Sequence, residues 1–381
     1  MIYLDNAATS WPKPPSVAEA MTKAVKELGA NPGRAGHQMA LEAGRGIYRT
    51  RVLLAKLFNI KNPLRIAFTQ NATYALNLAL LGLLQPGDHV ITSTLEHNSV
   101  ARPLYYLSQR GVKVTKIGLN EAGEFDLDLL EKSFQPNTRL VCLTHGSNVS
   151  GHILPIEKIG ALCRSRQVKF MVDAAQTAGV IPVDIEKMNI DILAFPGHKG
   201  LYGPQGTGGL YIAEGIELKP LVTGGTGSHS EYMEQPQVMP DQLESGTPNT
   251  PGIFGLGAGV EFVLKTGVEQ IHAREQALTE KLLAGLRALP EVIVYGPAEE
   301  RLPVVSINIK GAETSEVGFI LDKVFNIACR TGLHCAPEAH KTLGTFPIGT
   351  VRFSPGWFNT DEDIDKTIEA IKTIIKEMKG A

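Results

Sequence analysis

The central part of the chain alternates between short apolar runs and longer amphipathic stretches. The apolar runs are rich in Val, Ile and Leu and lack polar alternation, which favours strands buried on both faces. The predicted strands are Leu64–Phe68, His89–Ser93, Lys113–Ile117, Thr138–Thr144, Lys169–Val172, Ile190–Ala194 and Gly208–Ile212. The helices predicted between them are Thr73–Leu84, Ser99–Arg110, Leu127–Ser133 and Ile156–Arg166. Strands that alternate with helices predict an α/β fold whose sheet is mostly parallel and covered by helices on both faces.

Two helices are expected before this unit. Ser16-Val-Ala-Glu19 has the spacing of a capping box and predicts a helix that runs to about Leu28. Turn residues at Asn31–Arg34 predict a loop, and a long helix follows at roughly Leu41–Phe58.

A second, smaller α/β unit is expected toward the C-terminus. A helix from about Gly255 to Thr266 leads out of the sheet. The elements predicted after it are helices at His272–Leu289 and Ser315–Phe325, strands at Val292–Tyr295 and Val304–Ile309, and a C-terminal helix with Ile364, Ile368, Ile371, Ile375 and Met378 at helical spacing. We therefore expect a large domain over residues 16–260 and a small domain made of residues 1–15 and 261–381.

Length, composition and charge narrow the possible partners. A chain of 381 residues fits two domains. Its 37 Lys and Arg nearly balance its 39 Asp and Glu, and no dense basic cluster occurs, so we expect no nucleic acid partner. The N-terminal residues lack the pattern of a signal peptide, and the apolar run at Ala75–Leu84 is short of the roughly 20 residues that span a bilayer, so we expect no membrane association.

Four cysteines occur, and they differ in their surroundings. None forms a CxxC pair, so we expect no structural zinc and no other metal site. Few cysteines without a secretory signal predict free thiols in the cytoplasm. Cys142, Cys163 and Cys329 have apolar neighbours and are predicted to be core residues, whereas Cys335 lies beside a His among turn residues and is predicted to be exposed. A cationic neighbour there would favour the reactive thiolate.

Lys199 and Asp173 each follow a predicted buried strand. Lys199 lies in Phe195-Pro-Gly-His-Lys-Gly200, ahead of a dense run of glycines that permits close backbone approach to a ligand. A lysine held there can form a Schiff base, although a lone lysine after a strand is most often a surface residue. Asp173 is either a cap at the strand end or an acid at the carboxyl edge of the sheet, where such folds bind ligands. Pyridoxal 5′-phosphate (PLP) needs both groups, a Schiff-base lysine and an acid against its ring nitrogen.

Three further segments follow predicted strands. The first amides of the helix after Phe68, from Ala72 on, can receive a phosphate together with the Thr73 hydroxyl, unless Thr73 only caps its helix. His97 is either a structural residue or a ring that stacks on a flat cofactor and relays protons. Asn148 is either a turn residue or a donor to the phenolic oxygen of such a cofactor.

Taken in order, these residues resemble the class-V aminotransferases, which are PLP enzymes of the aspartate-aminotransferase-like fold, fold type I. Within that group the chain looks like a cysteine desulfurase of the SufS-like type, related to selenocysteine lyase-like enzymes. The resemblance spans nearly the whole chain. The segments that carry it are Tyr3-Leu-Asp-Asn-Ala-Ala8, Asn31-Pro-Gly-Arg-Ala-Gly-His37, Thr69–Asn77, Glu96-His97, Ser147-Asn-Val149, Val172–Gln176, Gly197-His-Lys199, Gly246-Thr-Pro-Asn249, Arg330-Thr-Gly-Leu-His-Cys335 and Val351-Arg-Phe-Ser354.

The resemblance implies a role for each matching residue. Lys199, Cys335 and His97 would be catalytic. The cofactor would be held by Ala72, Thr73, His97, Asn148, Asp173, Gln176, His198, Lys199 and Thr247, with Thr247 reaching the neighbouring subunit of a homodimer. The substrate would be held by His37, Asn148, Arg330 and Arg352, with Arg352 on its carboxylate. Pro196 replaces the usual Ser of the lysine motif, and because Pro has neither a hydroxyl nor an amide hydrogen, one phosphate hydrogen bond should be missing.

The implied activity is the conversion of L-cysteine to L-alanine. Cys335 would take the sulfur as a persulfide and pass it to an acceptor protein, for example in iron–sulfur cluster assembly. The alternatives are a selenocysteine lyase, or an aminotransferase, lyase or epimerase of the same fold, which would not need Cys335. A non-catalytic protein that relays sulfur is a third alternative, and the set of Lys199, Asp173 and His97 argues against it.

Overall fold

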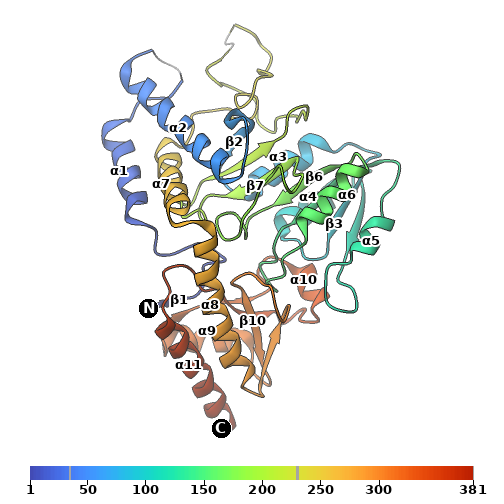
Figure 1. The fold of residues 1–381 in the computed structure, drawn as a ribbon, viewed down its shortest axis with the longest axis vertical. Coiled ribbons are helices and arrows are strands. Elements are labelled where there is room, and N and C mark those ends of the chain that lie inside the picture. The colour runs from blue at the N-terminus through green and yellow to red at the C-terminus, as the bar shows by residue number, and fades with distance from the viewer. Residues whose placement is uncertain (34–35, 229–230, 381) are drawn as a thin grey trace.

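A computed structural model describes residues 1–33, 36–228 and 231–380 of the chain. Arg34 and Ala35, which belong to one of the segments named above, lie outside the described residues. Figure 1 shows the central sheet with its helices in the upper part, and a smaller unit with both chain termini below it. Helices α7 and α8 pass from the upper part to the lower one.

The larger sheet has seven strands in the order β2-β8-β7-β6-β5-β3-β4. Their bounds are β2 (Ile66–Thr69), β3 (His89–Ser93), β4 (Lys113–Ile117), β5 (Thr138–Thr144), β6 (Lys169–Asp173), β7 (Ile192–Pro196) and β8 (Gly208–Ile212). β8 runs antiparallel to both of its neighbours, and the pairs from β7 to β4 are parallel. The predicted mostly parallel seven-stranded sheet is therefore confirmed.

Helices cover this sheet and continue into the smaller unit. They are α1 (Pro15–Glu27), α2 (Gln38–Leu57), η1 (Pro63–Arg65), α3 (Ala72–Leu83), α4 (Asn98–Ser108), α5 (Leu127–Lys132), α6 (Ile156–Ser165), α7 (Thr250–Thr266), α8 (Val268–Arg287), α9 (Thr314–Lys323), α10 (Pro337–Thr342) and α11 (Asp361–Gly380). α7 packs against α1 and α2 at the side of the sheet.

The smaller unit holds two further sheets. An antiparallel sheet of four strands has the order β12-β13-β10-β9, with β9 (Val292–Tyr295), β10 (Val305–Ile309), β12 (Arg330–Gly332) and β13 (Thr350–Phe353). A short parallel pair joins β1 (Ile2–Tyr3) to β11 (Ile327–Ala328). The first residues of the chain therefore lie beside the segment that leads to Cys335.

Four predicted helix starts were wrong. α2 begins at Gln38, with His37 at the cap position, instead of near Leu41. α1 begins at Pro15, with Pro14 at the cap position and no side-chain cap, because Pro is well suited to the first helical position and Ser16 already lies inside the helix. α7 begins at Thr250, where Asn249 accepts from the amide of Gly252, instead of near Gly255. α8 begins at Val268, directly after Gly267, instead of at His272.

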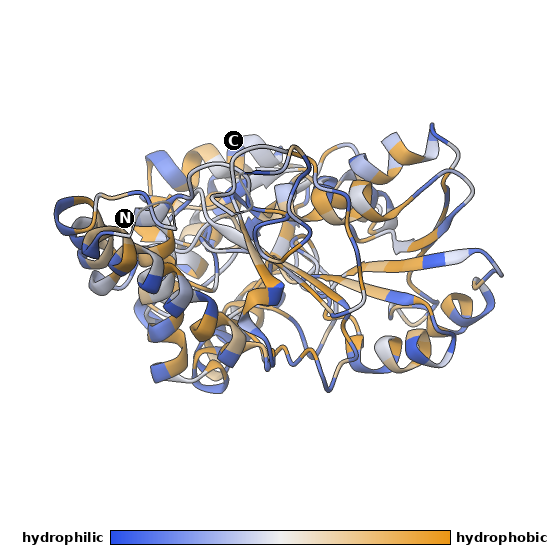
Figure 2. Cartoon of the chain, turned by 90° about the horizontal axis from the view of Figure 1, so that it is seen from above, coloured by the Kyte–Doolittle hydropathy of each residue, from blue (hydrophilic) through white to orange (hydrophobic). Residues whose placement is uncertain are grey.

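The apolar side chains separate into cores that match these units. The strands of the seven-stranded sheet are mostly hydrophobic in Figure 2, and the residues of its central strands β5, β6 and β7 are mostly buried, whereas the edge strand β4 is partly exposed. A separate cluster holds Leu4 together with residues from α8, β10, β13 and α11. From this separation we propose the two domains expected above, residues 16–260 and residues 1–15 with 261–381.

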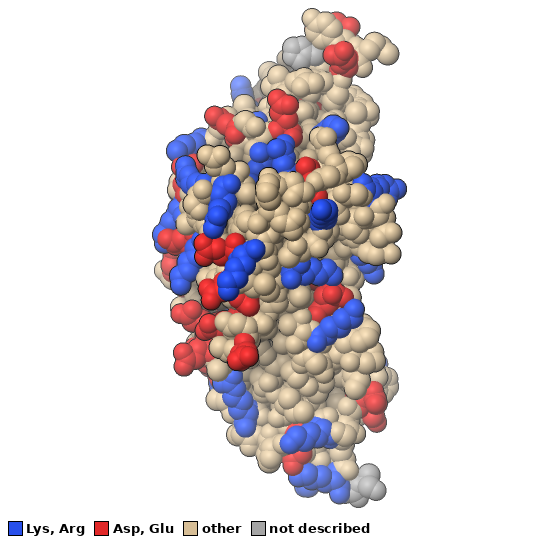
Figure 3. Space-filling model, turned by 90° about the vertical axis from the view of Figure 1, so that its right-hand side faces the viewer, with Lys and Arg blue, Asp and Glu red and all other residues tan. Residues whose placement is uncertain are grey.

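Charge and hydropathy at the surface agree with the composition. Lys and Arg side chains are interspersed with Asp and Glu on the face shown in Figure 3. Among the described helices, none combines the length and the apolar character that a membrane span requires.

Candidate active site

A cavity of about 210 Å³ lies at the carboxyl edge of the seven-stranded sheet, and we call it the central cavity. Parallel strands end at one edge of a sheet, so the residues that follow β3, β5, β6 and β7 meet there. The predicted site residues that line the central cavity are Ala72, Thr73, His97, Asn148, Asp173, Gln176, His198, Lys199, Arg330 and Arg352, and Pro196 lines it as well.

Lys199 and Asp173 occupy this cavity together. Burial lowers the pKa of Lys199 to about 8, with Arg352 and Arg330 lowering it further while Asp173 opposes them. Burial raises the pKa of Asp173, whose carboxylate accepts a hydrogen bond of 2.9 Å from the amide of Ala175. A buried carboxylate with one amide donor is well suited to pair with a cationic ring nitrogen.

The ring of His97 is neutral, and its Nδ1 accepts a hydrogen bond. It caps α4, and its Nδ1 accepts from the amide of Ser99 at 3.0 Å. Burial lowers the pKa of His97 to about 4, and four nearby cations, Lys199, Arg330, Arg352 and Arg102, lower it further. Because Nδ1 accepts a hydrogen bond, the proton of the neutral ring lies on Nε2.

The start of α3 forms an anion-binding end of the cavity. Asn71, and not Thr73, caps this helix, because its side chain accepts from the amide of Tyr74 at 2.8 Å. The Thr73 hydroxyl is therefore not needed as the cap, and it shares a hydrogen bond of 2.7 Å with the hydroxyl of Ser99. His198 also lines the cavity, and its buried Nδ1 has no partner among the described residues. A helix N-terminus with these side chains fits a phosphate group.

Pro196 ends β7 beside these groups. It faces Gly208 in the antiparallel register of β7 and β8, and it lines the central cavity. The position therefore offers no donor to a phosphate, as the sequence predicts.

Asn148 and Gln176 link the cavity to other segments. The side-chain amide of Asn148 donates to the carbonyl of His334 at 2.8 Å, and that of Gln176 donates to the carbonyl of Ala7 at 3.1 Å. Each side-chain amide has a second hydrogen that can serve a ligand.

Arg352 is completely buried and already partly paired. Its Nη2 lies 2.6 Å from Oδ1 of Asp5, its Nη1 donates to the carbonyl of Asn148 at 3.1 Å, and its buried Nε has no partner among the described residues. Asp5 thus fixes the guanidinium at the wall of the central cavity, where its charge suits a carboxylate ligand.

Cys335 is exposed, as predicted, on the loop after β12. The cation beside it is Arg330, whose Nη2 lies 3.2 Å from Sγ. The adjacent His334 is buried against Thr350, and burial lowers its pKa to about 2, so this ring is uncharged. Cys142 and Cys163 are buried as predicted, and Cys329 is half-buried.

Three predicted site residues do not line the central cavity of their own chain, namely Cys335, Thr247 and His37. Thr247 is exposed and accepts from Asn31 at 3.3 Å. His37 is exposed and caps α2 through the amide of Ala40. Thr247 lies just before α7 and His37 just before α2.

Sequence reasoning missed several residues that hold the site together. Glu96 is buried, accepts from the Ser93 hydroxyl at 2.6 Å and from the amide of Thr144 at 2.9 Å, and has a pKa raised to about 8 by burial. Lys13 and Ser10 both contact the carbonyl of His198, next to Lys199. The sequence offered a signal only for Glu96, which is an acid directly before His97. The contacts of Lys13 and Ser10 with His198 join segments far apart in the sequence and gave no signal.

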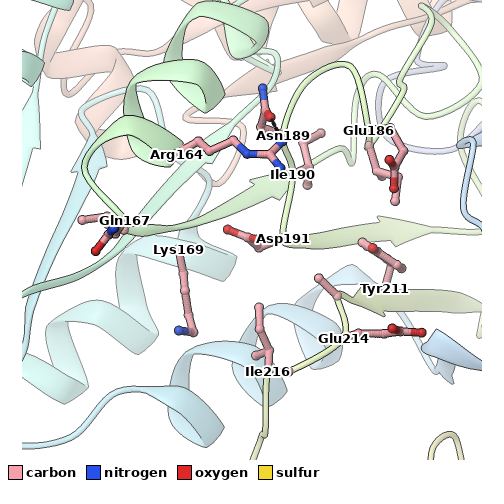
Figure 4. A pocket seen from close by; sticks show the side chains of 14 residues that line it. Arg164, Gln167, Lys169, Glu186, Asn189, Ile190, Asp191, Tyr211, Glu214 and Ile216 are labelled. Atoms are coloured by element: carbon pink, nitrogen blue, oxygen red, sulfur yellow. Dashed lines mark hydrogen bonds between the residues drawn. The ribbon is translucent and has the colours of Figure 1, made fainter.

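A further hollow of about 470 Å³ lies at the opposite, amino edge of the sheet (Figure 4). Arg164 points to Asn189 there and donates to its side chain, and Asp191 accepts from the amide of Phe170. These two charged side chains, Arg164 and Asp191, are thus already paired with a neighbouring side chain and with the backbone at a strand end. The carboxyl edge is therefore the better candidate for chemistry.

Comparison with known proteins identifies the family to which the chain belongs. The sequence model for aminotransferase class-V matches residues 2–367. The chain belongs to the class-V aminotransferase family. Among curated relatives of this family, a protein of Methanothermobacter thermautotrophicus named "probable cysteine desulfurase" is 36% identical over 98% of this chain and 94% of its own length. A cysteine desulfurase of Salmonella agona is 32% identical over 98% of this chain and 93% of its own length.

Solved structures give the same family and fold. The apo structure of a cysteine desulfurase from Thermococcus onnurineus matches with a TM-score of 0.93 and 34% identity, over 99% of this chain and 95% of that one. The cysteine desulfurase CsdA from Escherichia coli, in an S-sulfonic acid form, matches with a TM-score of 0.89 and 30% identity, over 98% of this chain and 94% of that one. The expected class-V aminotransferase fold is confirmed.

Proposed function

We propose that this protein is a PLP-dependent cysteine desulfurase that converts L-cysteine to L-alanine and receives the sulfur on Cys335. The observation that carries the proposal is one cavity lined by Lys199, Asp173 and Arg352, with an exposed thiol at its mouth. The names of relatives that share nearly the full length support it.

The described residues fit PLP. Asp173 would face the ring nitrogen, since its buried carboxylate gains the cation that it lacks. Lys199 would hold the cofactor covalently, and the start of α3 with Thr73 and the unpartnered Nδ1 of His198 would hold the phosphate. His97 would stack on the ring, and Asn148 and Gln176 would reach its phenolic oxygen. When bound, PLP supplies an electron sink for charge at the substrate's α-carbon.

The substrate would be oriented by arginines. Arg352 would take its carboxylate, because its guanidinium lines the central cavity and is already fixed there through Asp5. Lys199 would be the group that moves the α-proton, because its pKa of about 8 makes its amine a stronger base than the ring of His97, whose pKa is about 4.

Cys335 would then act as the nucleophile. Its thiolate is stabilised by Arg330 at 3.2 Å and attacks the substrate's sulfur, forming the S–S bond of a persulfide as the C–S bond breaks. A proton delivered to the β-carbon, where the C–S bond broke, and the return of the α-proton complete alanine; the net proton is the one that the Cys335 thiol gave up.

We also propose a homodimer. Thr247 would reach the phosphate of the neighbouring subunit and His37 its substrate pocket, because neither lines the cavity of its own chain. Leu41, Tyr48 and Val52 form an exposed apolar face of α2 that such a contact would cover. Free thiols are consistent with a cytoplasmic enzyme that passes sulfur to an acceptor protein.

The test is product analysis with a matched cysteine control. The enzyme purified with PLP should form alanine from L-cysteine, and mass spectrometry should find one added sulfur on Cys335. Cys335→Ala should keep the absorbance of the bound cofactor and lower alanine formation at least ~100-fold, while Cys329→Ala stays active. Full alanine formation by Cys335→Ala would remove Cys335 from the mechanism, and keto acid in place of alanine would indicate an aminotransferase. Activity of Cys335→Ala that survives only with selenocysteine would indicate a selenocysteine lyase.

A further inference from the structure

A second hollow, of about 440 Å³, lies directly outside the thiol of Cys335, and we call it the outer hollow. Its lining residues are Thr73, Asn77, His97, Asn98, Ser99, Arg102, Pro103 and Cys335. Thr73, His97 and Ser99 also line the central cavity, so the two spaces adjoin. A molecule in the outer hollow would therefore meet Cys335 from the side away from Lys199.

Two packed helices form the walls of this hollow. Thr73 and Asn77 are one turn apart on α3, and Asn98 and Arg102 are one turn apart on α4. The amide of Asn98 donates to the carbonyl of Cys335 at 2.8 Å, which fixes the cysteine loop at the start of α4. The position of the thiol relative to Arg102 is thus set by the fold.

The lining has the charge of an anion site. Arg102 is its one Arg or Lys, and no Asp or Glu lines it. Arg102 makes no hydrogen bond or ion pair with another residue in the part of the chain that the structure describes. Arg330, by contrast, already contacts Cys335, and Arg352 contacts Asp5 and is assigned to the substrate carboxylate in the central cavity. The guanidinium of Arg102 is therefore free to bind a carboxylate.

We propose that the outer hollow binds a carboxylate on the thiol that accepts sulfur from Cys335, and that Arg102 recognises it. This inference rests on the proposed function in one respect, the persulfide on Cys335. Arg102 is a specificity-determining residue for the acceptor, whereas the carboxylate of the amino acid substrate goes to Arg352 in the central cavity.

The transfer step balances without an outside reagent. The acceptor thiolate attacks the outer sulfur of the persulfide, a new S–S bond forms, and the S–S bond to Cys335 breaks. Cys335 leaves as a thiolate beside Arg330. The outer sulfur moves to the acceptor together with its hydrogen. The acceptor's carboxylate, when bound to Arg102, would hold the attacking thiolate near Cys335. The positive charge of Arg102 would offset the repulsion between the thiolate and other anions.

The experiment measures persulfide loss from the full-length holoenzyme. One sample of Cys335 is loaded with limiting L-cysteine and another with inorganic polysulfide, and intact-protein and peptide mass spectrometry follow the added sulfur. The acceptors are mercaptopropionate, mercaptoethanol and cysteamine, which carry a negative, neutral and positive group, and rates are corrected for thiolate fraction. A second set of acceptors consists of peptides that carry a single Cys beside either Asp or Asn. A comparison of their rates with those of the small thiols distinguishes a protein acceptor from a small thiol.

Mercaptopropionate should react about 10-fold faster than mercaptoethanol at low ionic strength, and added salt should reduce this preference. Arg102→Gln should abolish the preference, Arg102→Lys should keep part of it, and Arg102→Glu should favour cysteamine. The first turnover of alanine should be unchanged in Arg102→Gln. A wild-type enzyme without preference, or a preference that survives Arg102→Gln, overturns the proposal.

Two further outcomes distinguish a failure of the Arg102 proposal from a failure of the proposed function and from a role of Arg102 in a subunit contact. If L-cysteine loads no sulfur, the proposed function fails, and the polysulfide-loaded samples still decide the role of Arg102. If Arg102→Gln changes dimer dissociation but leaves the thiol preference intact, Arg102 serves a subunit contact and the proposal is wrong.

Discussion

At the scale of single residues, burial sets which groups in the central cavity are charged. Lys199 and His97 both have pKa values lowered chiefly by burial, to about 8 and about 4. Neutral pH thus leaves His97 uncharged and Lys199 mostly charged, with a minor fraction of its amine neutral. A lysine amine that loses its proton near neutral pH can bond to a carbonyl and move protons, which an exposed lysine does poorly.

Replacement of Lys199 tests this role. Lys199→Ala should still bind PLP through Asp173 and the start of α3, but without the covalent link, and alanine formation should fall about 10³-fold or more. Borohydride reduction followed by mass spectrometry should fix the cofactor to the wild-type chain and not to this variant. Reduction at another lysine would assign the link elsewhere. Lys187→Ala, an exposed lysine, is the control.

Pro196 offers a gain-of-function test. Pro196→Ala restores a backbone amide and Pro196→Ser restores both the amide and a hydroxyl beside the expected phosphate. If one hydrogen bond to the phosphate is missing, Pro196→Ser should hold PLP about 10-fold more tightly than the natural chain, with Pro196→Ala between them. Cofactor dissociation followed by absorbance measures this. Equal affinity in all three would show that the position does not reach the phosphate.

At the scale of elements, the N-terminal segment joins the two halves of the site. β1 pairs with β11, Asp5 pairs with Arg352, and Ser10 and Lys13 contact the carbonyl of His198. A segment of little regular structure thus connects the strand before the Cys335 loop to the peptide that carries Lys199. Its position is fixed by polar contacts and not by its own propensity.

Asp5→Asn tests that connection. The variant leaves the fully buried guanidinium of Arg352 without a charged partner, and because Asp5 is partly exposed we expect a loss of about 2 kcal/mol in the free energy of unfolding. KM for L-cysteine should rise several-fold because Arg352 loses its fixed orientation. Urea unfolding and steady-state kinetics measure the two effects. A lower KM would instead mean that Asp5 competes with the substrate.

Glu275 on α8 makes stability depend on pH. The carboxyl is buried, one oxygen lies 3.5 Å from the Tyr202 hydroxyl, and the other has no partner among the described residues. Burial raises the pKa of Glu275 to about 8 from 4.5. The unfolded chain therefore releases a proton between these values that the folded chain retains, so this stabilising contribution is full below pH 4.5 and is lost as pH rises to about 8.

Glu275→Gln should remove this contribution to the pH dependence. Relative to the natural chain, its free energy of unfolding should rise by about 2 kcal/mol between acid and mildly alkaline pH. Urea unfolding at both pH values measures the change. Glu280→Gln, an exposed position on the same helix, should show no such rise, and an equal pH dependence in both variants would contradict the assignment.

At the scale of the whole molecule, the proposed active site draws on a second copy of the chain. Thr247 and His37 lie outside the central cavity, and α2 exposes apolar side chains. A second copy would cover this face and could bring Thr247 to the neighbouring phosphate.

Mixed dimers test this arrangement. If Thr247 acts across the interface, a dimer of one Lys199→Ala chain and one Thr247→Ala chain contains one wholly natural site and one doubly altered site. Mixing the two inactive or weakened proteins should then restore up to about half of the natural activity and a tight class of PLP sites, as expected when each site draws on both chains. Absence of rescue in verified mixed dimers would place Thr247 in its own chain's site or outside it.

The sequence by itself determined the order of the elements and the residues that end the parallel strands. Asp173, Asn148, His97 and Lys199 could be predicted to meet because each follows a buried strand, and parallel strands end at one edge. Helix starts at Pro15 and Thr250 were missed because proline and cap signals compete locally.

Only the tertiary structure decided which distant segments complete the site. The pairing of Asp5 with Arg352, the contact of Arg330 with Cys335, and the place of Arg102 beside that thiol join separate elements. The burial of His334, which leaves Arg330 as the cation, was decided in the same way. Periodicity reports which face of an element is buried, whereas the partner of a polar side chain depends on how the elements pack, and that information is not local in the chain.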